Sequence, residues 1–303
     1  MTGAAGLIGS AVTRRLLECG HAVIACDDFS IGTWRDVREF VTWDDVDVSA
    51  PDAMQRFAQH APDVVLHCAA HPGGRSVAEP SADVRVNALG AMHVFEWCAR
   101  RQIPLVYLSS SAVYGEQPPL PIAESAPLHP GTVYAVCKVA CENFLRVLEA
   151  EYGLRWTVLR LFATYGAGHR PSTTQGIVNV MLTQLLAGNK VIVRGTLDRV
   201  RDLVYVDDAA EAIAACMFET RARGRVLNIG TGRAIRVGEV ITNLCDLLGR
   251  SSSELTIDEQ QATVGDPFYS VADTEAMRAT TGFIARVPLE EGLARLVAAR
   301  VGH

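Results

Sequence analysis

Lysine is almost absent from this sequence: Lys138 and Lys190 are the only two among 303 residues, against 26 arginines. Basic residues are also outnumbered, 28 to 34, by acidic ones, which gives a net charge of −6. Because no basic run interrupts this acidic balance, we expect no nucleic acid partner. The scarcity of lysine makes each of the two lysines a position to examine for function.

Long apolar runs and paired cysteines are also missing. No stretch reaches the roughly 20 apolar residues that a membrane-spanning helix needs, and no signal peptide is recognisable, so we expect a cytoplasmic protein without membrane contact. The eight cysteines are scattered singly and form no C-x-x-C pair. This spacing argues against a disulfide framework or a zinc site, and the scattered histidines suggest no other metal site.

The remaining composition, 49% hydrophobic and 20% charged, is that of an ordinary globular protein. Short apolar runs alternate with helical patterns along the first half of the chain. We expect helices over residues 7–19, 51–60, 81–101 and 133–152, and strands over residues 21–27, 63–67, 103–108 and 156–160. This alternation predicts an α/β fold with a doubly wound parallel sheet, Rossmann-like in class.

The alternation loosens after residue 165, where glycine, proline and polar loops separate shorter elements. We therefore expect a cofactor-binding domain over residues 1–165 and a smaller substrate lobe over residues 166–303, partly interleaved with the first. Ligands of such folds bind at the carboxyl ends of the strands, and here we expect them between the two lobes.

A glycine-rich loop opens the chain as Thr2-Gly3-Ala4-Ala5-Gly6-Leu7-Ile8-Gly9. Such a loop joins a strand to a helix, and its backbone N–H groups bind a pyrophosphate at the helix N-terminus. Only Met1 precedes the loop, so we expect the first strand to be truncated and the true start to lie further upstream.

An acidic residue supports the dinucleotide interpretation. Asp27 ends the second expected strand, 18 residues after Gly9, where a carboxylate can bind both ribose hydroxyls and would repel a 2′-phosphate. This favours NAD as the cofactor, although Asp27 and its neighbour could instead begin a solvated loop. The other candidates for cofactor contact lie in the loop or near strand ends: Gly3, Gly6, Leu7, Ile8, Gly9, Asp28, Asp47, Val48, Cys68, Ala69, Ala70 and Asn87.

Tyr134 and Lys138 are four residues apart in the helix expected over 133–152, which puts both side chains on one face. An ammonium beside a phenol favours the phenolate, and a phenolate can act as a general base. Both side chains are also candidates for cofactor contact. A serine hydroxyl from the neighbouring strand end, in Ser109-Ser110-Ser111, can orient a substrate hydroxyl and relay its proton.

These motifs together resemble the NAD-dependent epimerase/dehydratase family of extended short-chain dehydrogenases, and its UDP-glucose 4-epimerase-like members in particular. The resemblance covers nearly the whole chain: the TGxxGxxG loop, a serine four residues before the tyrosine of Val113-Tyr114-Gly115, and the Y-x-x-x-K pair. It implies that Ser110, Tyr134 and Lys138 are catalytic. It also implies a nucleotide-diphosphate sugar as substrate and a homodimer formed through the helices expected over 81–101 and 133–152.

The second lobe carries further matches. Segments 159–166, 175–178 and 199–208 resemble the family's LRxFNxYG, substrate-loop and RDFVYVDD segments, which implies that Arg201 binds the substrate's phosphates. Two positions depart from the family: Ala163 replaces an asparagine, and Thr263 replaces the arginine before Gly265-Asp266. The candidates for substrate contact are Arg75, which could equally be a solvated loop charge, and Ser110, Ala163, Gln175, Gly176, Arg201 and Asp266.

The expected reaction is epimerisation, most simply at C4 of the sugar. Dehydratases of the family carry an acidic pair or a glutamate directly after the catalytic threonine, whereas Ser111-Ala112 offers no carboxylate. The alternatives are a nucleotide-sugar reductase or dehydrogenase that releases its cofactor, and a non-catalytic NAD-binding protein.

Overall fold

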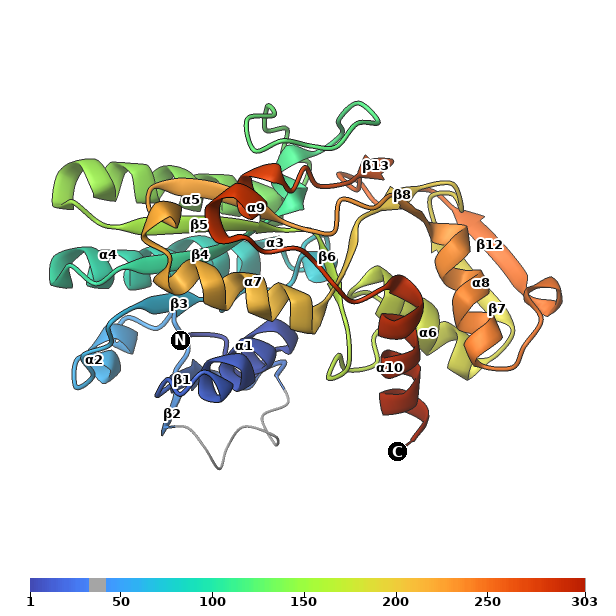
Figure 1. Ribbon diagram of the computed structural model, residues 1–303, viewed down its shortest axis with the longest axis horizontal. Coiled ribbons are helices and arrows are strands. Elements are labelled where there is room, and N and C mark those ends of the chain that lie inside the picture. The colour runs from blue at the N-terminus through green and yellow to red at the C-terminus, as the bar shows by residue number, and fades with distance from the viewer. Residues whose placement is uncertain (33–41, 303) are drawn as a thin grey trace.

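A central parallel sheet organises the chain, for which a computed structural model describes residues 1–32 and 42–302 (Figure 1). The sheet confirms the expected doubly wound α/β class, and the strands expected over 21–27, 63–67, 103–108 and 156–160 lie within or close to those ranges. The strands follow one another across the sheet in the order β2 (Thr42–Asp45), β1 (Ile24–Asp27), β3 (Val65–His67), β4 (Leu105–Ser110), β5 (Trp156–Leu161) and β10 (Arg225–Ile229).

Met1 and Thr2 lie at the centre of this sheet, between β1 and β3. Thr2 forms parallel bridges to Cys26 on one side and to His67 on the other. On the β1 side, the Cys26 N–H donates to the Met1 carbonyl at 2.8 Å. On the β3 side, the Thr2 N–H donates to the Leu66 carbonyl at 3.0 Å, and the Cys68 N–H donates to the Thr2 carbonyl at 3.1 Å. Two residues thus join the halves of the sheet where the sequence predicts a shortened first strand.

A cavity of about 30 Å³ adjoins this central position. Its lining is mostly apolar and includes Ile24, Phe57, Val94 and Trp97. The cavity therefore lies between the sheet and the helices beside it, next to the short contact that Met1 and Thr2 make.

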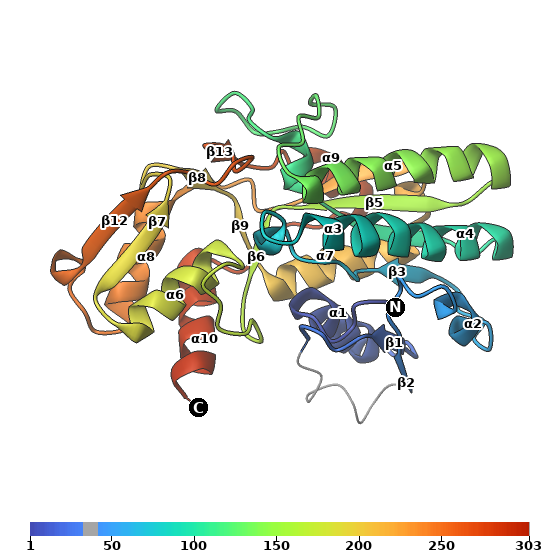
Figure 2. The ribbon, with the colours of Figure 1, turned by 180° about the vertical axis from the view of Figure 1, so that it is seen from behind.

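Helices cover both faces of the sheet (Figures 1 and 2). One face carries α1 (Leu7–Glu18), α7 (Val206–Phe218) and α9 (Glu275–Thr281). The opposite face carries α2 (Ala53–Phe57), α3 (Pro80–Ala82), the π-helical η2 (Asp83–Gly90), α4 (Ala91–Arg101) and α5 (Val133–Tyr152). The helix expected over 81–101 is thus continuous in space, but its first half is wound as a π-helix.

The ends of α5 follow from its flanking residues. The Thr132 hydroxyl accepts a hydrogen bond from the Ala135 N–H at 3.1 Å and so caps the N-terminus. Gly153 adopts a left-handed conformation with φ of 69° and ends the helix. These two residues set where the helix that carries Tyr134 and Lys138 begins and ends.

The second half of the chain builds smaller sheets beside the main one and then returns to it through β10, α7 and α9 (Figure 1). The domain boundary at residue 165 remains a prediction. The remaining elements are β6 (Ala163–Tyr165), α6 (Ile177–Ala187), β7 (Lys190–Arg194), β8 (Val200–Arg201), β9 (Leu203–Tyr205), β11 (Ile235–Arg236), α8 (Val237–Leu247), β12 (Thr256–Gln260), β13 (Tyr269–Ser270) and α10 (Leu289–Val301), with short 3-10 turns η1 (Gly73–Arg75), η3 (Ser111–Tyr114), η4 (Thr220–Ala222) and η5 (Ser252–Glu254).

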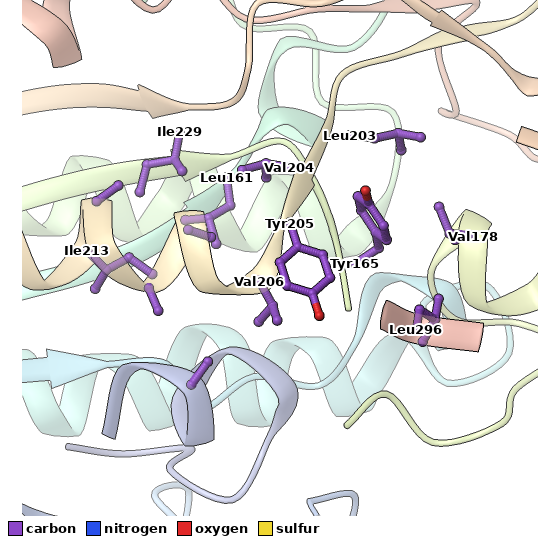
Figure 3. Packing of buried hydrophobic residues seen from close by; sticks show 14 of the residues in the cluster. Leu161, Tyr165, Val178, Leu203, Val204, Tyr205, Val206, Ile213, Ile229 and Leu296 are labelled. Atoms are coloured by element: carbon purple, nitrogen blue, oxygen red, sulfur yellow. The ribbon is translucent and has the colours of Figure 1, made fainter. Parts of the chain in front are cut away.

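A continuous hydrophobic core joins the main sheet to the elements of the second half. Figure 3 shows part of this core, to which Leu161 of β5, Leu203 of β9 and Leu296 of α10 all belong. The rings of Tyr165 and Tyr205 pack edge to face with their centroids 5.5 Å apart. Within the described residues, no helix is both long enough and apolar enough to cross a membrane.

Candidate functional site

The glycine loop has the close backbone contacts that only glycine permits. Gly3 has φ of 67°, and a Cβ atom there would lie 2.5 Å from the Ala69 nitrogen. A Cβ atom at Gly9 would lie 2.1 Å from the Gly3 carbonyl oxygen. Gly6 precedes α1, whose N-terminus has no side-chain cap, so the first N–H groups of α1, which include those of Leu7 and Ile8, are available to an anion.

Asp27 lies at the end of β1 and is buried next to this loop. Its two carboxylate oxygens accept hydrogen bonds from the Ala5 N–H at 2.8 Å and from the Phe29 N–H at 2.9 Å. Burial raises the pKa of Asp27, and these backbone hydrogen bonds partly offset that rise. The carboxylate of the neighbouring Asp28 is bonded locally, to the N–H and the hydroxyl of Ser30.

Three other predicted cofactor contacts lie around the adjoining strand ends. Asp47, just after β2, accepts hydrogen bonds from Ser49 and Arg85. Burial alone would raise the pKa of Asp47, but these hydrogen bonds and the charge of Arg85 outweigh it and lower the pKa. Val48 is buried, and its carbonyl accepts a hydrogen bond from His93 at 3.0 Å. Cys68 follows β3, and burial raises the pKa of its thiol to about 12, so it is an unreactive thiol.

Asn87, in the π-helical η2, holds the loop that follows β3. Its side-chain oxygen accepts the His71 N–H at 2.7 Å, and its amide nitrogen donates to the His71 carbonyl at 3.0 Å and to Asp83 at 3.1 Å. The His71 ring completes this buried group by bonding Asp83 at 2.8 Å. The loop segment containing Ala69 and Ala70 is thereby fixed against the glycine loop, where Gly3 meets Ala69.

Lys138 reaches β4 from α5, and Tyr134 lies beside it on the same helix. The Lys138 ammonium is buried, donates to the Leu108 carbonyl at 2.8 Å and lies 5.6 Å from the centre of the Tyr134 ring. Leu108 is two residues before Ser110, whose hydroxyl accepts a hydrogen bond from the Ala112 N–H at 3.2 Å. The single buried lysine among the described residues thus links the tyrosine helix to the serine strand.

A buried ion pair lies one helical turn beyond Lys138. Glu142 accepts hydrogen bonds from the Ser109 hydroxyl at 2.6 Å and from the Arg160 guanidinium at 3.0 and 2.7 Å. The Arg160 guanidinium lies 4.8 Å from the centre of the Tyr114 ring. Glu142, Ser109 and Arg160 thus connect α5, β4 and β5, next to the catalytic candidates Lys138 and Ser110.

The loop after β3 also approaches the second half of the chain. A Cβ atom at Gly73 would lie 3.1 Å from the Tyr134 ring, and one at Gly74 would lie 2.1 Å from the Thr174 carbonyl oxygen. The predicted substrate contacts Gln175 and Gly176 follow Thr174, so they are brought near Tyr134 through this loop. Arg75 is exposed in the same loop and has no side-chain partner among the described residues.

The remaining substrate candidates lie on the strands and loop of the second half. Arg201, at the end of β8, bonds Asp266 at 2.6 Å. Ala163 begins β6, and its N–H donates to the Asp202 carbonyl at 3.1 Å. A Cβ atom at Gly131 would lie 2.5 Å from Gly265, so the loop carrying Asp266 packs against the residues that precede Tyr134.

Two polar residues here were not predicted from the sequence. The Ser76 hydroxyl accepts the Tyr134 N–H at 3.1 Å, and Arg199 shares the Asp266 carboxylate with Arg201. The spacing of Arg199 and Arg201 carried a signal, because residues two apart on a strand face the same side. No such signal marks Ser76, which is distant in sequence. Across residues 1–32 and 42–302, no three His, Cys, Asp or Glu side chains gather closely enough to hold a metal ion.

The residues around the glycine loop fit a dinucleotide. Gly3 and Gly9 leave room for close backbone approach, α1 offers free N–H groups to a pyrophosphate, and Asp27 stands at the end of the adjacent strand. The backbone donors that now bond Asp27 show that its carboxylate faces the loop.

The sequence and the fold of this chain are similar to those of known proteins of one family. The model of the NAD dependent epimerase/dehydratase family matches residues 1–230. A UDP-glucose 4-epimerase of Mycolicibacterium smegmatis is 32% identical over 98% of this chain and 96% of its own.

Two solved structures are similar over almost their whole length. The UDP-glucose 4-epimerase of Thermus thermophilus in complex with NAD is 32% identical, with a TM-score of 0.91 over 99% of this chain and 98% of its own. The Thermotoga maritima UDP-glucose 4-epimerase with UDP-glucose is 31% identical, with a TM-score of 0.92 over 99% and 97%. The cofactor is therefore NAD, and the chain belongs to the NAD-dependent epimerase/dehydratase family.

Proposed function

We propose that this protein is an NAD-dependent epimerase that inverts C4 of a nucleotide-diphosphate sugar. The observation that carries the proposal is the Lys138 ammonium, buried between α5 and β4 and 5.6 Å from the Tyr134 ring, beside a strand end that carries Ser110. No carboxylate follows Ser110 at positions 111 and 112, so the acid and base that a dehydration requires are not supplied there.

Tyr134 and Ser110 handle the proton of the sugar's C4 hydroxyl. Tyr134, as the phenolate, accepts that proton, and the positive charge of Lys138 stabilises the phenolate. The Ser110 hydroxyl orients the sugar oxygen toward Tyr134. NAD, when bound, would supply the acceptor for the hydride that leaves C4, and would return that hydride to C4 on the opposite face. After the keto-sugar turns its other face, Tyr134 returns the proton and the epimer leaves.

The proposed substrate is a nucleoside diphosphate sugar, with the diphosphate held by Arg201. A guanidinium suits this role because its fork of N–H groups matches phosphate oxygens. The names of the relatives favour UDP as the nucleotide. Because Ala163 and Thr263 stand where the resemblance leads us to expect asparagine and arginine, the test uses four nucleotides rather than UDP alone.

Proton NMR of the anomeric signals tests the proposal directly. The protein is incubated with NAD and, in turn, UDP-, dTDP-, GDP- and CDP-sugars, and we expect one sugar to yield its C4 epimer. The Tyr134→Phe variant removes the hydroxyl and should abolish conversion. Tyr152→Phe is the matched control, because Tyr152 lies on the same helix, is 40% exposed and should leave the rate unchanged.

The alternative functions give different results in the same experiment. Net formation of NADH, or rapid exchange of added cofactor with substrate consumption, would identify a dehydrogenase or reductase. Tight NAD binding without conversion of any sugar would identify a non-catalytic NAD-binding protein, and either result would refute the epimerase proposal.

A cytoplasmic homodimer completes the proposal. The outer face of α5 exposes Val133, Val136 and Val147 by 37%, 51% and 52%, and α4 lies beside it (Figure 2). An apolar stripe of this kind suits a second copy of the same helix pair. Val136→Glu should therefore shift the mass measured by light scattering from dimer to monomer, whereas Val301→Glu on α10 should not; a monomeric wild-type protein would contradict the dimer.

A further inference from the structure

Two arginines approach one carboxylate at the start of β8. Arg199 immediately precedes β8 and Arg201 ends it, and their side chains are only 5% and 9% exposed. Arg201 bonds Asp266 at 2.6 Å, and Arg199 forms an ion pair with the other oxygen of the same carboxylate. Both guanidinium groups also donate to the Pro267 carbonyl, at 3.2 and 2.7 Å.

The positive charge of this pair is not fully balanced by the groups in contact with it. Arginine stays protonated in proteins, so two buried cations share the single carboxylate of Asp266. Glu116 adds some negative potential at Arg201 while its own carboxylate is bonded to the Phe268 N–H at 2.8 Å. Burial lowers the pKa of Arg201, and the charge of Arg199 lowers it further.

Arg199 also has an unused donor. Its Nε atom is buried and has no hydrogen-bond partner, although the two terminal nitrogens bond the Arg194 and Pro267 carbonyls. A buried guanidinium N–H without an acceptor costs free energy that an incoming anion can recover. Asp266 differs from both arginines in being 40% exposed, so its side chain is free to turn outward.

The loop that carries Asp266 borders the catalytic candidates. Gly265 packs so closely on Gly131 that a Cβ atom on either residue would clash with the other backbone. Gly131 is followed by Thr132, the cap of α5, and then by Tyr134 in the first turn of that helix. An anion held by the two arginines would therefore lie on the side of the molecule where the sugar is expected.

From this arrangement we infer that Arg199 and Arg201 together bind the diphosphate of the substrate, and that Asp266 occupies both guanidinium groups until the diphosphate displaces it. The inference rests on the proposed function for the substrate class and adds Arg199 as a specificity residue. Arg199, directly before β8, supplies a second positive charge beside that of Arg201.

Isothermal titration with UDP, with inorganic pyrophosphate and with uridine tests the inference without any turnover. Arg199→Gln should weaken UDP binding about tenfold to a hundredfold, because a hydrogen-bonded charge contributes roughly that much to affinity. Uridine, which carries no phosphate, should bind this variant as it binds the wild type. Arg236→Gln is the control, since Arg236 is exposed on the adjoining strand β11 and should leave all three affinities unchanged.

Asp266→Asn provides a second test, in which the affinity for pyrophosphate should rise rather than fall. Removing the competing carboxylate should strengthen pyrophosphate binding several-fold, a gain that a purely structural role of the ion pair cannot produce. Thermal melts of both variants establish that they are folded at the titration temperature. If Arg199→Gln binds UDP as tightly as the wild type, or if Asp266→Asn binds pyrophosphate no better, the inference is overturned. The proposed epimerase activity is measured separately and could survive either result.

Discussion

Replacing Glu142 by methionine is expected to cost about 3–5 kcal/mol of unfolding free energy, the range measured when one partner of a buried ion pair is removed. The side chains of Glu142 and Arg160 are 1% and 3% exposed, so water cannot solvate the guanidinium that remains. The Ser109 hydroxyl and two guanidinium nitrogens would also lose their acceptor. A domain's whole stability is about 5–15 kcal/mol, so this loss would remove a large share of it.

The double variant Glu142→Met/Arg160→Met separates the cost of an unpaired charge from the loss of the pair itself. Methionine fills similar space without charge, and buried pairs replaced in this way are often neutral in stability. Recovery should be incomplete here, because Arg160 also donates to the Glu124 carbonyl at 3.0 Å and covers the Tyr114 ring. We expect the double variant to regain at least about half of the loss.

Urea unfolding followed by circular dichroism, without added NAD, measures both variants. Glu96→Met is the matched control, because Glu96 pairs with Arg100 on the surface of α4, where both side chains are exposed, and it should leave the urea midpoint nearly unchanged. A Glu142→Met variant as stable as this control, or a double variant no more stable than the single one, would refute the reasoning.

Two further predictions concern the glycine loop and the central histidine. Gly3→Ala should weaken NAD binding at least tenfold in a fluorescence titration, because the new Cβ would lie 2.5 Å from the Ala69 nitrogen. Gly20→Ala is the control for backbone strain alone, since Gly20 has φ of 82° and open space around it. Equal effects of the two substitutions on NAD binding would contradict a steric clash at Gly3. Burial lowers the pKa of His67 to about 3, so the unfolded chain takes up its proton first as the pH falls below the ordinary value of 6.5. The wild type should therefore lose roughly 2 kcal/mol between pH 8 and pH 5 relative to His67→Gln in urea unfolding, and parallel curves for the two proteins would contradict this prediction.

The parallel sheet could be predicted because its signals are local. Each of the four expected strands is a short apolar run, and these runs alternate with helical patterns. The Tyr134–Lys138 pair was also predictable, since four residues along a helix fix a common face. The same reasoning gave one helix over 81–101, whereas residues 83–90 form a π-helix in which Asn87 and Asp83 reach the His71 loop. No periodicity in the sequence marks that change of winding.

Contacts between distant segments could not be predicted from local patterns. Ser76 meets Tyr134 across 58 residues, and Arg199 reaches a carboxylate 67 residues further along the chain. Such partners depend on how loops meet in space, and a single sequence does not encode them in its spacing. The catalytic candidates lie on β4 and α5, where spacing along a regular element guides a prediction, whereas Gln175, Gly176 and Asp266 lie on loops, where spacing gives no such guide.

Within the described residues, the two halves of the sheet are joined through Met1 and Thr2, so binding of the cofactor should also affect the stability of the sheet. Asp27 on the β1 side of Met1 and Thr2, and Ala69 on the β3 side, both contact the glycine loop that fits a dinucleotide. A ligand bound across a seam adds stability by mass action, about 2.7 kcal/mol at a hundred times its dissociation constant. Bound NAD would then stabilise the centre of the sheet. In the protein without NAD, the backbone amides of Cys26 and Cys68 should therefore exchange hydrogen faster than those of β4 and β5.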